Sequence, residues 1–265
     1  MLLAQISDLH VRPEGRLYKD VVDSNRMLDD AIAHLNALAP RPDLLLVTGD
    51  LVDEGTDAEY AAVRARLNRC ALPYLVIPGN HDDRRNFRRA FADHAYLPPA
   101  DAPMHYVVDG HPVRVVAFDT TVPGQHHGDV DAAGLAWLAD TLGRDRVRPT
   151  VILLHHPPFS CGIPYLDKYM CRQPERLAEI VASFGNVERV LCGHVHRPIQ
   201  LRWAGTLMCS CPSTATQIAL RLTPEAVPAS YGEPPACLLH WWRPGAGMIS
   251  HTSYIGRFDG PYDFA

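Results

Sequence analysis

The sequence predicts an α/β fold in which two packed mixed β-sheets are flanked by helices, within a single domain spanning residues 1–265. Short apolar runs alternate with amphipathic segments over the first two thirds of the chain, and short strand-like segments fill the last third. The 265 residues show no low-complexity linker and no internal repeat, and 47% of them are hydrophobic. A chain of this size and composition can bury one large core.

The N-terminal third predicts repeated β-α-β units. Its expected strands are 2–6, 44–47 and 74–77, and its expected helices are 24–38 and 57–69. Ser24 and Asp57 are the expected N-caps, because their side chains can accept hydrogen bonds from the free N–H groups of a first helical turn. Repeated β-α-β order implies a largely parallel sheet covered by helices.

The rest of the chain predicts a continuation of this pattern and then a change. In the middle we expect strands at 113–118, 150–154 and 188–191 and helices at 132–142 and 174–183. The later strands are expected at 199–203, 207–210, 217–222, 236–242 and 248–254. Pro and Gly separate these short strands, which predicts an antiparallel C-terminal part.

Two segments depart from the regular pattern. Residues 160–174 form a long aromatic loop that we expect to line a substrate pocket, with an ordinary surface loop as the alternative. Within it, the rings of Tyr165 and Tyr169 would suit a nucleobase, and the Asp167 carboxylate would suit ribose or glycerol hydroxyls. Residues from about 245 to 265 are aromatic and Gly-rich. We expect them to pack on a neighbouring subunit or over the active-site mouth, with a self-packed tail as the alternative.

Composition excludes several classes of protein. A net charge of −5 argues against a nucleic-acid partner held by a basic field. No segment predicts a membrane span or a signal peptide, and seven cysteines without a C-x-x-C pair argue against a disulfide framework, so we expect a cytoplasmic protein. Lys19 and Lys168 are the only lysines and neither follows a Gly, which excludes a phosphate-binding P-loop. Zincin, Rossmann and serine-hydrolase motifs are also absent from the sequence.

Polar clusters follow predicted strands at five places along the chain. They are Asp8-Leu9-His10, Gly49-Asp50, Gly79-Asn80-His81-Asp82, His155-His156-Pro157-Pro158 and Gly193-His194-Val195-His196. Each cluster alone is typical of an ordinary turn. The carboxyl ends of parallel strands meet at one edge of a sheet, so all five together indicate a common site. Carboxylate, imidazole and amide donors suit transition-metal ions without a thiolate ligand.

These five clusters resemble the motifs of the calcineurin-like metallophosphoesterases, whose fold is a four-layer αββα sandwich. Within that superfamily the sequence is most similar to class III cyclic nucleotide phosphodiesterases and bacterial glycerophosphodiesterases. The closer similarity rests on PGNHDD, on HHPP followed by GIPYLD, on CGHVHRP, and on Pro212-Ser213-Thr214 with Gln217 three residues later.

The resemblance implies a binuclear centre of two divalent metal ions, with Mn, Fe, Zn and Co as candidates. It places Asp8, His10 and His196 on the first ion, Asn80, His155 and His194 on the second, and Asp50 on both. Two ions held roughly 3.5–4 Å apart would supply a hydroxide nucleophile and neutralise the phosphate oxygens during in-line attack. His156 is the alternative to His155 in this set of ligands.

The resemblance also implies roles for residues that face the substrate. His81 is expected to be catalytic, by stabilising the phosphoryl group or by donating a proton to the leaving group, with orientation of Asp50 as the alternative. Asn80 is expected to contact substrate as well. Thr216 stands where some relatives carry a second phosphate-facing His. Because Thr cannot carry charge, we expect phosphomonoesters to be handled poorly.

Other polar residues favour plainer interpretations. For Arg84 and its neighbouring arginines we favour a solvated helix face over a phosphate-guiding patch. For His126 and His127 we favour a surface loop over a place in the pocket.

The sequence thus predicts a metal-dependent phosphodiesterase acting on small phosphodiesters, namely 3′,5′-cyclic nucleotides, glycerophosphodiesters or both. A phosphomonoesterase or nuclease on the same fold is the first alternative, and a non-catalytic metal-containing scaffold is the second. We expect no membrane or nucleic-acid partner, and a homo-oligomer of two or more copies.

Overall fold

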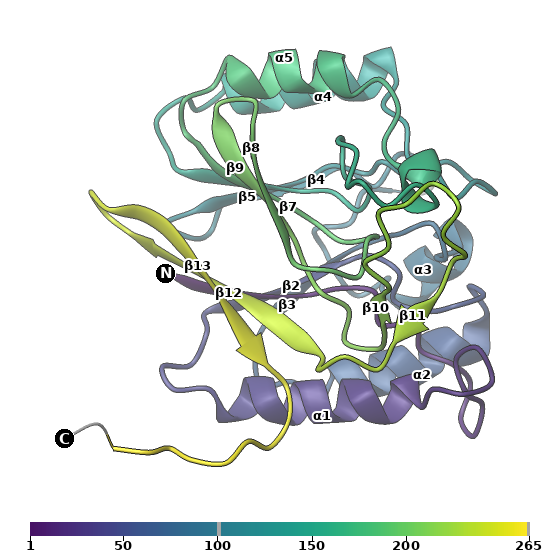
Figure 1. The fold of residues 1–265 in the computed structure, drawn as a ribbon. Coiled ribbons are helices and arrows are strands. Elements are labelled where there is room, and N and C mark those ends of the chain that lie inside the picture. The colour runs from purple at the N-terminus through teal and green to yellow at the C-terminus, as the bar shows by residue number, and fades with distance from the viewer. Residues whose placement is uncertain (100–101, 264–265) are drawn as a thin grey trace.

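A computed structural model describes residues 1–99 and 102–263. Two β-sheets lie face to face in it, and helices cover the outer face of each (Figure 1). The first sheet has the strand order β13-β12-β1-β2-β3. Its strands are β1 (Leu2–Ile6), β2 (Leu44–Thr48), β3 (Tyr74–Ile77), β12 (Ala236–Arg243) and β13 (Gly247–Tyr254).

The second sheet has the strand order β4-β5-β6-β7-β9-β8. Its strands are β4 (Tyr106–Val108), β5 (Arg114–Ala117), β6 (Thr150–Leu153), β7 (Val187–Cys192), β8 (Ile199–Trp203) and β9 (Thr206–Ser210). Strands β5, β6, β7 and β9 are parallel, and the two edge strands run antiparallel to their neighbours. Both sheets are therefore mixed, as the sequence predicts.

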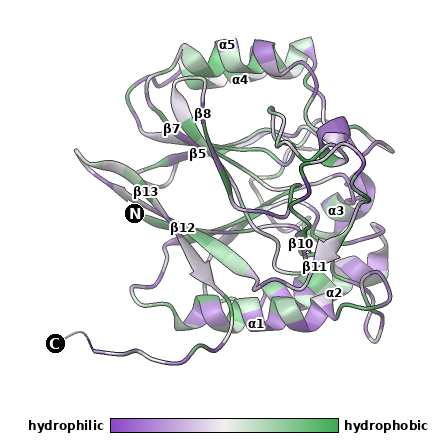
Figure 2. Ribbon diagram, in the orientation of Figure 1, coloured by the Kyte–Doolittle hydropathy of each residue, from purple (hydrophilic) through white to green (hydrophobic). Residues whose placement is uncertain are grey.

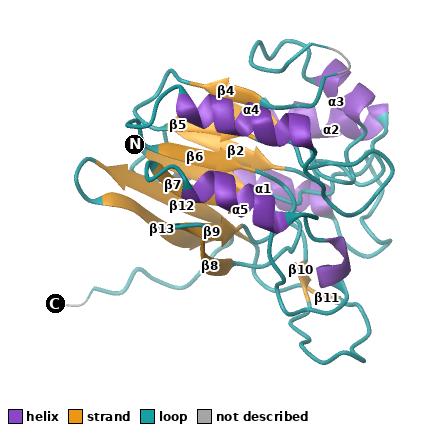
Figure 3. Cartoon of the chain, turned by 90° about the horizontal axis from the view of Figure 1, so that it is seen from above, coloured by secondary structure: helices purple, strands orange, loops and turns teal. Residues whose placement is uncertain are grey.

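The helices complete four layers. Those beside the first sheet are α1 (Ser24–Ala37), α2 (Asp57–Leu67) and α3 (Arg84–Ala90), and those beside the second are α4 (Ala132–Gly143) and α5 (Pro174–Ala182). Seen from above, α4 and α5 lie over the strands of their sheet (Figure 3). A short 3-10 helix, η1 (Leu166–Tyr169), and a two-stranded pair, β10 (Gln217–Ile218) and β11 (Ser230–Tyr231), lie at one end of the sandwich.

The apolar run of β2 shows why the layers stack in this way. Side chains alternate between the two faces of a strand. Leu45 and Val47 pack with α1 and α2, while Leu44 and Leu46 pack between the two sheets. Because both faces are covered, all five residues of β2 are buried and the strand reads as a continuous apolar run.

Helix α1 is amphipathic, since Leu28, Ile32 and Leu35 are buried on one face, and Figure 2 shows both hydrophobic and hydrophilic residues along α1 and α2. Their N-caps lie one residue before the predicted ones. Asp23 accepts the main-chain N–H of Arg26, and Thr56 forms a capping box with Glu59. Ser24 and Asp57 are the first residues inside their helices.

The C-terminal strands depart most from prediction. Strand β9 runs parallel to β7 and lies between β7 and β8, and β12 returns to the first sheet to pair with β1. An antiparallel arrangement therefore holds for the β12–β13 and β8–β9 pairs but not for the whole segment. The strand expected at 217–222 is shortened to Gln217–Ile218, and β4 and α3 were not predicted.

The end of the described chain projects from the sandwich. After β13, the chain runs away from the end that carries β10 and β11 in both Figure 1 and Figure 3. Phe258 and Tyr262 are largely exposed there. Residues 245–263 therefore do not cover the active-site mouth. The last two residues of the predicted segment, 264–265, lie outside the described residues.

All seven cysteines are free thiols. Within the described ranges, no helix combines the length and apolar character that a bilayer-spanning helix requires.

Candidate metal centre

The predicted ligands all follow the carboxyl ends of neighbouring strands. Asp8 and His10 follow β1, Asp50 follows β2, Asn80 follows β3, His155 follows β6, and His194 and His196 follow β7. The predicted catalytic residue His81 comes directly after Asn80. These strands belong to two different sheets, and their loops gather at the end of the sandwich that also carries β10 and β11 (Figure 1). The sandwich therefore brings the five sequence clusters together.

The backbone is strained where several of these side chains turn into the centre. Asp8, His10, Asp50, His194 and His196 have φ values of 54°, 44°, 49°, 69° and 52°. Residues other than Gly rarely adopt this left-handed conformation, and such strain concentrates at functional sites.

Two glycines of the clusters are required by close packing. A Cβ on Gly79 would collide with the Asp50 carboxylate, and a Cβ on Gly193 would collide with the Ser7 hydroxyl. The Gly that precedes Asn80 and the Gly that precedes His194 follow from this lack of space.

One cluster of donors joins Asp8, His10 and His196, which are all buried. The Nε2 atom of His196 lies 3.1 Å from Nε2 of His10 and 3.5 Å from Oδ1 of Asp8. The other ring nitrogen of His196, Nδ1, lies 2.8 Å from the carbonyl oxygen of Thr216 and donates to it. That hydrogen bond leaves the Nε2 lone pair free for a cation.

A second cluster surrounds His155. Its Nε2 atom lies 3.2 Å from Oδ1 of Asn80 and 3.3 Å from Oδ2 of Asp50, and its Nδ1 donates to the carbonyl oxygen of Thr48 at 2.8 Å. His156 places its Nδ1 2.9 Å from the hydroxyl of Thr120, and a ring nitrogen of His156 lies within 4.8 Å of ring nitrogens of His155 and His194. Of the two neighbouring histidines, His155 is thus the one that faces Asp50 and Asn80.

Asp50 lies between the two clusters. Its Oδ2 atom lies 3.9 Å from Nε2 of His10 and 3.3 Å from Nε2 of His155. Burial raises the pKa of the Asp50 carboxyl, but the imidazoles of His155, His81 and His10 outweigh it and hold the pKa well below the usual value. Asp50 therefore stays ionised.

The donor set fits metal ions. The Nε2 atom of His194 is buried without a hydrogen-bond partner, and its main-chain N–H donates to the Asp8 carboxylate at 3.0 Å. Buried carboxylates and an unpartnered buried imidazole nitrogen in one place are costly unless a cation joins them. The set combines oxygen and nitrogen donors without a thiolate, as borderline divalent transition metals prefer.

His81 borders this centre through both its backbone and its ring. Its main-chain N–H donates to Oδ1 of Asp50 at 2.8 Å, and its Nδ1 donates to the carbonyl oxygen of Asp53 at 2.7 Å. Burial lowers the pKa of the His81 imidazole, but Asp50 and Asp53 outweigh it and raise the pKa above its usual value. The contact of His81 with Asp50 is thus made by the main-chain N–H and not by the imidazole. The imidazole therefore remains available to a substrate.

Asp82 stabilises the loop that carries Asn80 and His81. Its carboxylate accepts the main-chain N–H groups of Gly79 and Leu51 at 2.8 and 3.1 Å, and the Tyr60 hydroxyl at 2.8 Å. Burial and then the charge of Asp50 raise the pKa of Asp82 to about 7. Asp82 thereby joins the loop after β3 to the loop after β2.

A hollow of about 520 Å³ opens onto the centre. Its walls include the predicted residues Tyr165, Tyr169 and Thr216, and three that the sequence did not single out as substrate contacts, namely Tyr18, Lys19 and Ile218. His126 is exposed on its loop as expected but also lines the hollow, 3.4 Å from the amide nitrogen of Asn80. His127 is buried, which corrects the expectation of a surface position for that residue.

Asp167 does not take the predicted place on this wall. Its carboxylate accepts the main-chain N–H groups of Cys161 and Gly162 at 2.7 and 3.2 Å, and the hydroxyl of Ser160 at 2.5 Å. It is absent from the residues that line the hollow in the described chain. The Asp167 oxygens that would accept hydrogen bonds from sugar or glycerol hydroxyls instead accept them from the backbone and Ser160 of its own loop, and they stabilise that loop.

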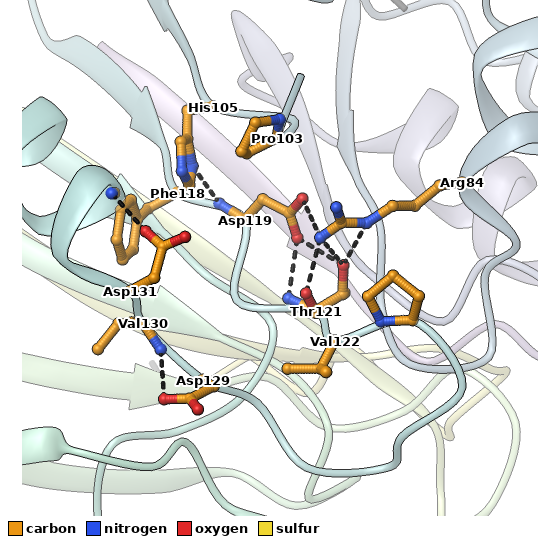
Figure 4. A pocket seen from close by; sticks show the side chains of 12 residues that line it. Arg84, Pro103, His105, Phe118, Asp119, Thr121, Val122, Asp129, Val130 and Asp131 are labelled. Atoms are coloured by element: carbon orange, nitrogen blue, oxygen red, sulfur yellow. Dashed lines mark hydrogen bonds and ion pairs between the residues drawn. The ribbon is translucent and has the colours of Figure 1, made fainter. Parts of the chain in front are cut away.

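A separate hollow of about 280 Å³ lies beside the centre and is shown in Figure 4. Arg84 donates there to Asp119 at 2.8 Å and to the carbonyl oxygen of Thr121 at 2.7 Å. The His105 ring accepts the main-chain N–H of Asp119 through Nδ1. Arg84 is thus paired with a buried carboxylate and is not free to guide a phosphate, whereas Arg85 and Arg89 of the same helix are exposed, as expected.

Comparison with known proteins decides the family. Residues 1–198 match the family model described as calcineurin-like phosphoesterase. The chain belongs to the calcineurin-like phosphoesterase family. This confirms the resemblance inferred from the five clusters, and the family is one of metal-dependent hydrolases.

Individual relatives of this phosphoesterase cover most of its length. It is 34% identical over 265 residues to a probable glycerophosphodiester phosphodiesterase, GpdQ, of Arcobacter nitrofigilis. The match covers 100% of this chain and 97% of the relative. It is 29% identical to a 3′,5′-cyclic adenosine monophosphate phosphodiesterase, CpdA, of Haemophilus influenzae, over 81% of this chain and 77% of the relative.

A solved structure shares the fold. A dimetal phosphatase from Danio rerio superposes on this phosphoesterase with a TM-score of 0.66 at 15% identity, covering 97% of this chain and 99% of that one. The four-layer sandwich predicted from the sequence is thereby confirmed.

Proposed function

We propose that this phosphoesterase hydrolyses small phosphodiesters at a binuclear metal centre. One observation carries the proposal: Asp50 lies within 3.9 Å of an imidazole nitrogen in each donor cluster. A carboxylate in that position can bridge two cations.

The proposed ligands follow the two clusters. Asp8, His10 and His196 would hold the first ion, Asn80, His155 and His194 the second, and Asp50 both. When bound, two divalent ions lower the pKa of a coordinated water and neutralise charge on the phosphate oxygens. Mn, Fe, Zn and Co are all compatible with these donors.

His81 is the proposed catalytic residue of the chain itself. Its Nδ1–H is held by the carbonyl oxygen of Asp53, so Nε2 is the nitrogen free to meet a substrate. A proton held on Nε2 can stabilise the phosphoryl oxygens and pass to the departing alkoxide. The raised pKa of His81 favours this protonated form.

The rest of the hollow's lining favours an alcohol that carries a ring. Tyr18, Tyr165 and Tyr169 present aromatic surfaces to the hollow, and Ile218 adds an apolar one. Base–aromatic stacking contributes about 1–3 kcal/mol. Because these aromatic surfaces can stack on a nucleobase, we favour 3′,5′-cyclic nucleotides, with glycerophosphodiesters as the second candidate that the GpdQ relative suggests.

We also propose a preference between phosphate esters and a state of the protein in the cell. Thr216 lines the hollow in place of a cationic side chain, which supports preference for a singly charged diester over a monoester. We also retain a cytoplasmic homo-oligomer as the working proposal for the protein in the cell.

The test compares bis(p-nitrophenyl) phosphate with p-nitrophenyl phosphate after reconstitution with Mn²⁺. We expect a large preference for the diester, followed by turnover of cyclic AMP and glycerophosphocholine. Preference for the monoester would overturn the phosphodiesterase proposal in favour of a phosphatase. Two bound metals without turnover of either compound would support a non-catalytic scaffold.

A further inference from the structure

One permanently charged cation lines the hollow of about 520 Å³ that opens onto the metal centre. Lys19 is the only lysine or arginine among the described residues of its lining. Within the described ranges Lys19 has no carboxylate partner, and its Nζ atom lies instead 5.4 Å from the centroid of the Tyr18 ring. Arg84, beside the centre, is by contrast paired with the buried Asp119. Lys19 is therefore the cation that is free to meet a ligand in this hollow.

The Tyr18 ring connects Lys19 to the metal centre. Tyr18 is buried, and its ring stacks on the ring of the proposed ligand His10 with an interplanar angle of 19°. The two ring centroids lie 4.6 Å apart and Nζ of Lys19 lies 5.4 Å from that of Tyr18, so Nζ lies within about 10 Å of the His10 ring. A group only a few covalent bonds away from a bound phosphorus atom can therefore reach this ammonium.

The backbone at Lys19 is strained. The Tyr18 carbonyl oxygen accepts the main-chain N–H of Val21 at 3.2 Å, which closes a tight turn with Lys19 and Asp20 at its two central positions. Their φ values are 51° and 60°. Turns with two left-handed central residues favour Gly, Asn and Asp, and the Cβ of a lysine is disfavoured there. Such strain concentrates at ligand-binding sites, and here it falls on the residue that lines the hollow.

The phosphodiester group itself does not require this ammonium. A phosphodiester carries one negative charge, and the proposed centre would meet it with two divalent ions and the His81 imidazole. The lining around Lys19 is aromatic or apolar at Tyr165, Tyr169 and Ile218, and Asp50 is the only carboxylate among the described lining residues. An anionic group elsewhere on the substrate would thus find Lys19 as its partner in a charge-assisted hydrogen bond.

We propose that Lys19 is a specificity-determining residue that binds a second anionic group on the alcohol portion of the substrate. The inference rests on the proposed phosphodiesterase activity and adds a substrate class to it, namely diesters whose alcohol also carries a phosphate or a carboxylate. A 3′,5′-cyclic nucleotide has no such group and would leave Lys19 without a partner.

The first test uses p-nitrophenyl thymidine 5′-phosphate with and without a 3′-phosphate, at saturating Mn²⁺. We expect wild-type kcat/KM to be about 3- to 10-fold higher for the 3′-phosphorylated compound, mainly through KM. Lys19→Gln should abolish this preference and Lys19→Arg should keep it. Lys168→Gln is the matched control, because Lys168 is the other lysine of the chain, is exposed on η1 and does not line the hollow.

A second pair of substrates separates a carboxylate from a phosphate. Glycerophosphoserine and glycerophosphoethanolamine differ by one carboxylate, and we compare their kcat/KM values in the same four proteins. A preference that depends on Lys19 in either pair supports the inference and shows which anionic group is bound. Ratios that Lys19→Gln leaves unchanged in both pairs would overturn it.

Salt dependence distinguishes binding of an anion from a structural role of Lys19. An exposed charge pair is screened by salt, so the wild-type preference should shrink as ionic strength rises, whereas the ratio for Lys19→Gln should stay constant. Lys19→Gly removes the ammonium and relieves the left-handed strain, so it should lose the preference without a lower midpoint of thermal unfolding. Retention of the full preference by Lys19→Gly would also overturn the inference.

Binding without turnover separates this inference from the proposed function. Calorimetry of the Mn²⁺-loaded protein compares thymidine 3′,5′-bisphosphate with thymidine 5′-phosphate. If the wild type hydrolyses none of the diesters, the proposed function fails. Tighter binding of the bisphosphate by wild type than by Lys19→Gln, with equal binding of the monophosphate, would still assign the anion site. Equal binding of the bisphosphate by both proteins would exclude it.

Discussion

Oδ2 of Asp50 lies 3.3 Å from Nε2 of His155, although the two residues follow strands that belong to different sheets. The loop after β2 supplies the carboxylate, and the loop after β6 supplies the imidazole. Neither sheet contains the centre by itself. Packing of the two sheets and assembly of the site are therefore one event.

Asp50→Asn tests the proposed bridge. Loss of the carboxylate charge between two cations should weaken both metal sites, so we expect kcat/KM to fall by more than about 100-fold. Inductively coupled plasma analysis after dialysis measures the metal content, and circular dichroism checks the fold. Two equivalents of metal with wild-type turnover would exclude the bridging role.

His81→Ala tests the proposed acid separately from the metals. The ring lines the hollow but is not among the proposed ligands, so both metals should remain bound. Turnover of a diester with a poor leaving group should drop by about 10²- to 10⁴-fold. We therefore expect the variant to have normal metal content and a low kcat. Unchanged turnover would show that His81 has no catalytic role.

Tyr165→Ala tests the preference for a ring-bearing alcohol. Loss of one stacking surface should raise KM for cyclic AMP by about 5- to 100-fold, on the basis of 1–3 kcal/mol per stacked base. KM for glycerophosphocholine should change little. Tyr231→Ala is the matched control, because Tyr231 is exposed on β11 and does not line the hollow. Equal effects on the two substrates would argue against base stacking.

The raised pKa of His155 leads us to expect that metal binding releases a proton. Burial lowers the pKa of its imidazole, but the Asp50 carboxylate outweighs burial and raises the pKa to about 9 in the metal-free protein. Below that pH a proton must leave Nε2 before a cation can bind. The apparent Mn²⁺ affinity should therefore rise with pH up to about 9, by at most about tenfold per pH unit. Calorimetry in buffers of different ionisation enthalpy counts the released protons, and their absence would contradict the prediction.

The lowered pKa of the buried His240 leads us to expect that the folded state loses stability in acid. Its ring is buried between Gln5 and Ser250, and burial lowers the pKa of its imidazole to about 3. The unfolded chain binds a proton near pH 6.5 whereas the folded chain does not, so stability is lost as pH falls from 6.5 toward 3. The loss attributable to His240 is at most about 1.4 kcal/mol per pH unit.

Urea unfolding of metal-free protein at several pH values measures this loss. His240→Gln keeps the possibility of hydrogen bonds to Gln5 and Ser250 but cannot gain a proton. Its stability should therefore fall less than that of the wild type between pH 6.5 and 4. Parallel curves for the two proteins would rule out the assigned contribution.

Much of the secondary structure could be predicted because its signal is local. The strand around Leu45 is buried on both faces and is therefore a continuous apolar run. Helix α3, with the sequence RRNFRRA, has one buried residue, Phe87, and therefore shows no apolar periodicity. The order of β7, β9 and β8 was missed because nothing local in a strand specifies which neighbour it pairs with.

The sequence by itself determined the family and the chemical types in the site, because backbone strain and close packing restrict which residues can end each strand. Gly193 and His194 are readable as a motif for that reason. Only the tertiary structure showed that Asp53 faces two histidines, that His126 lines the hollow and that Asp167 turns away from it. These positions depend on how separate loops pack in space, and no periodicity along the chain records that packing.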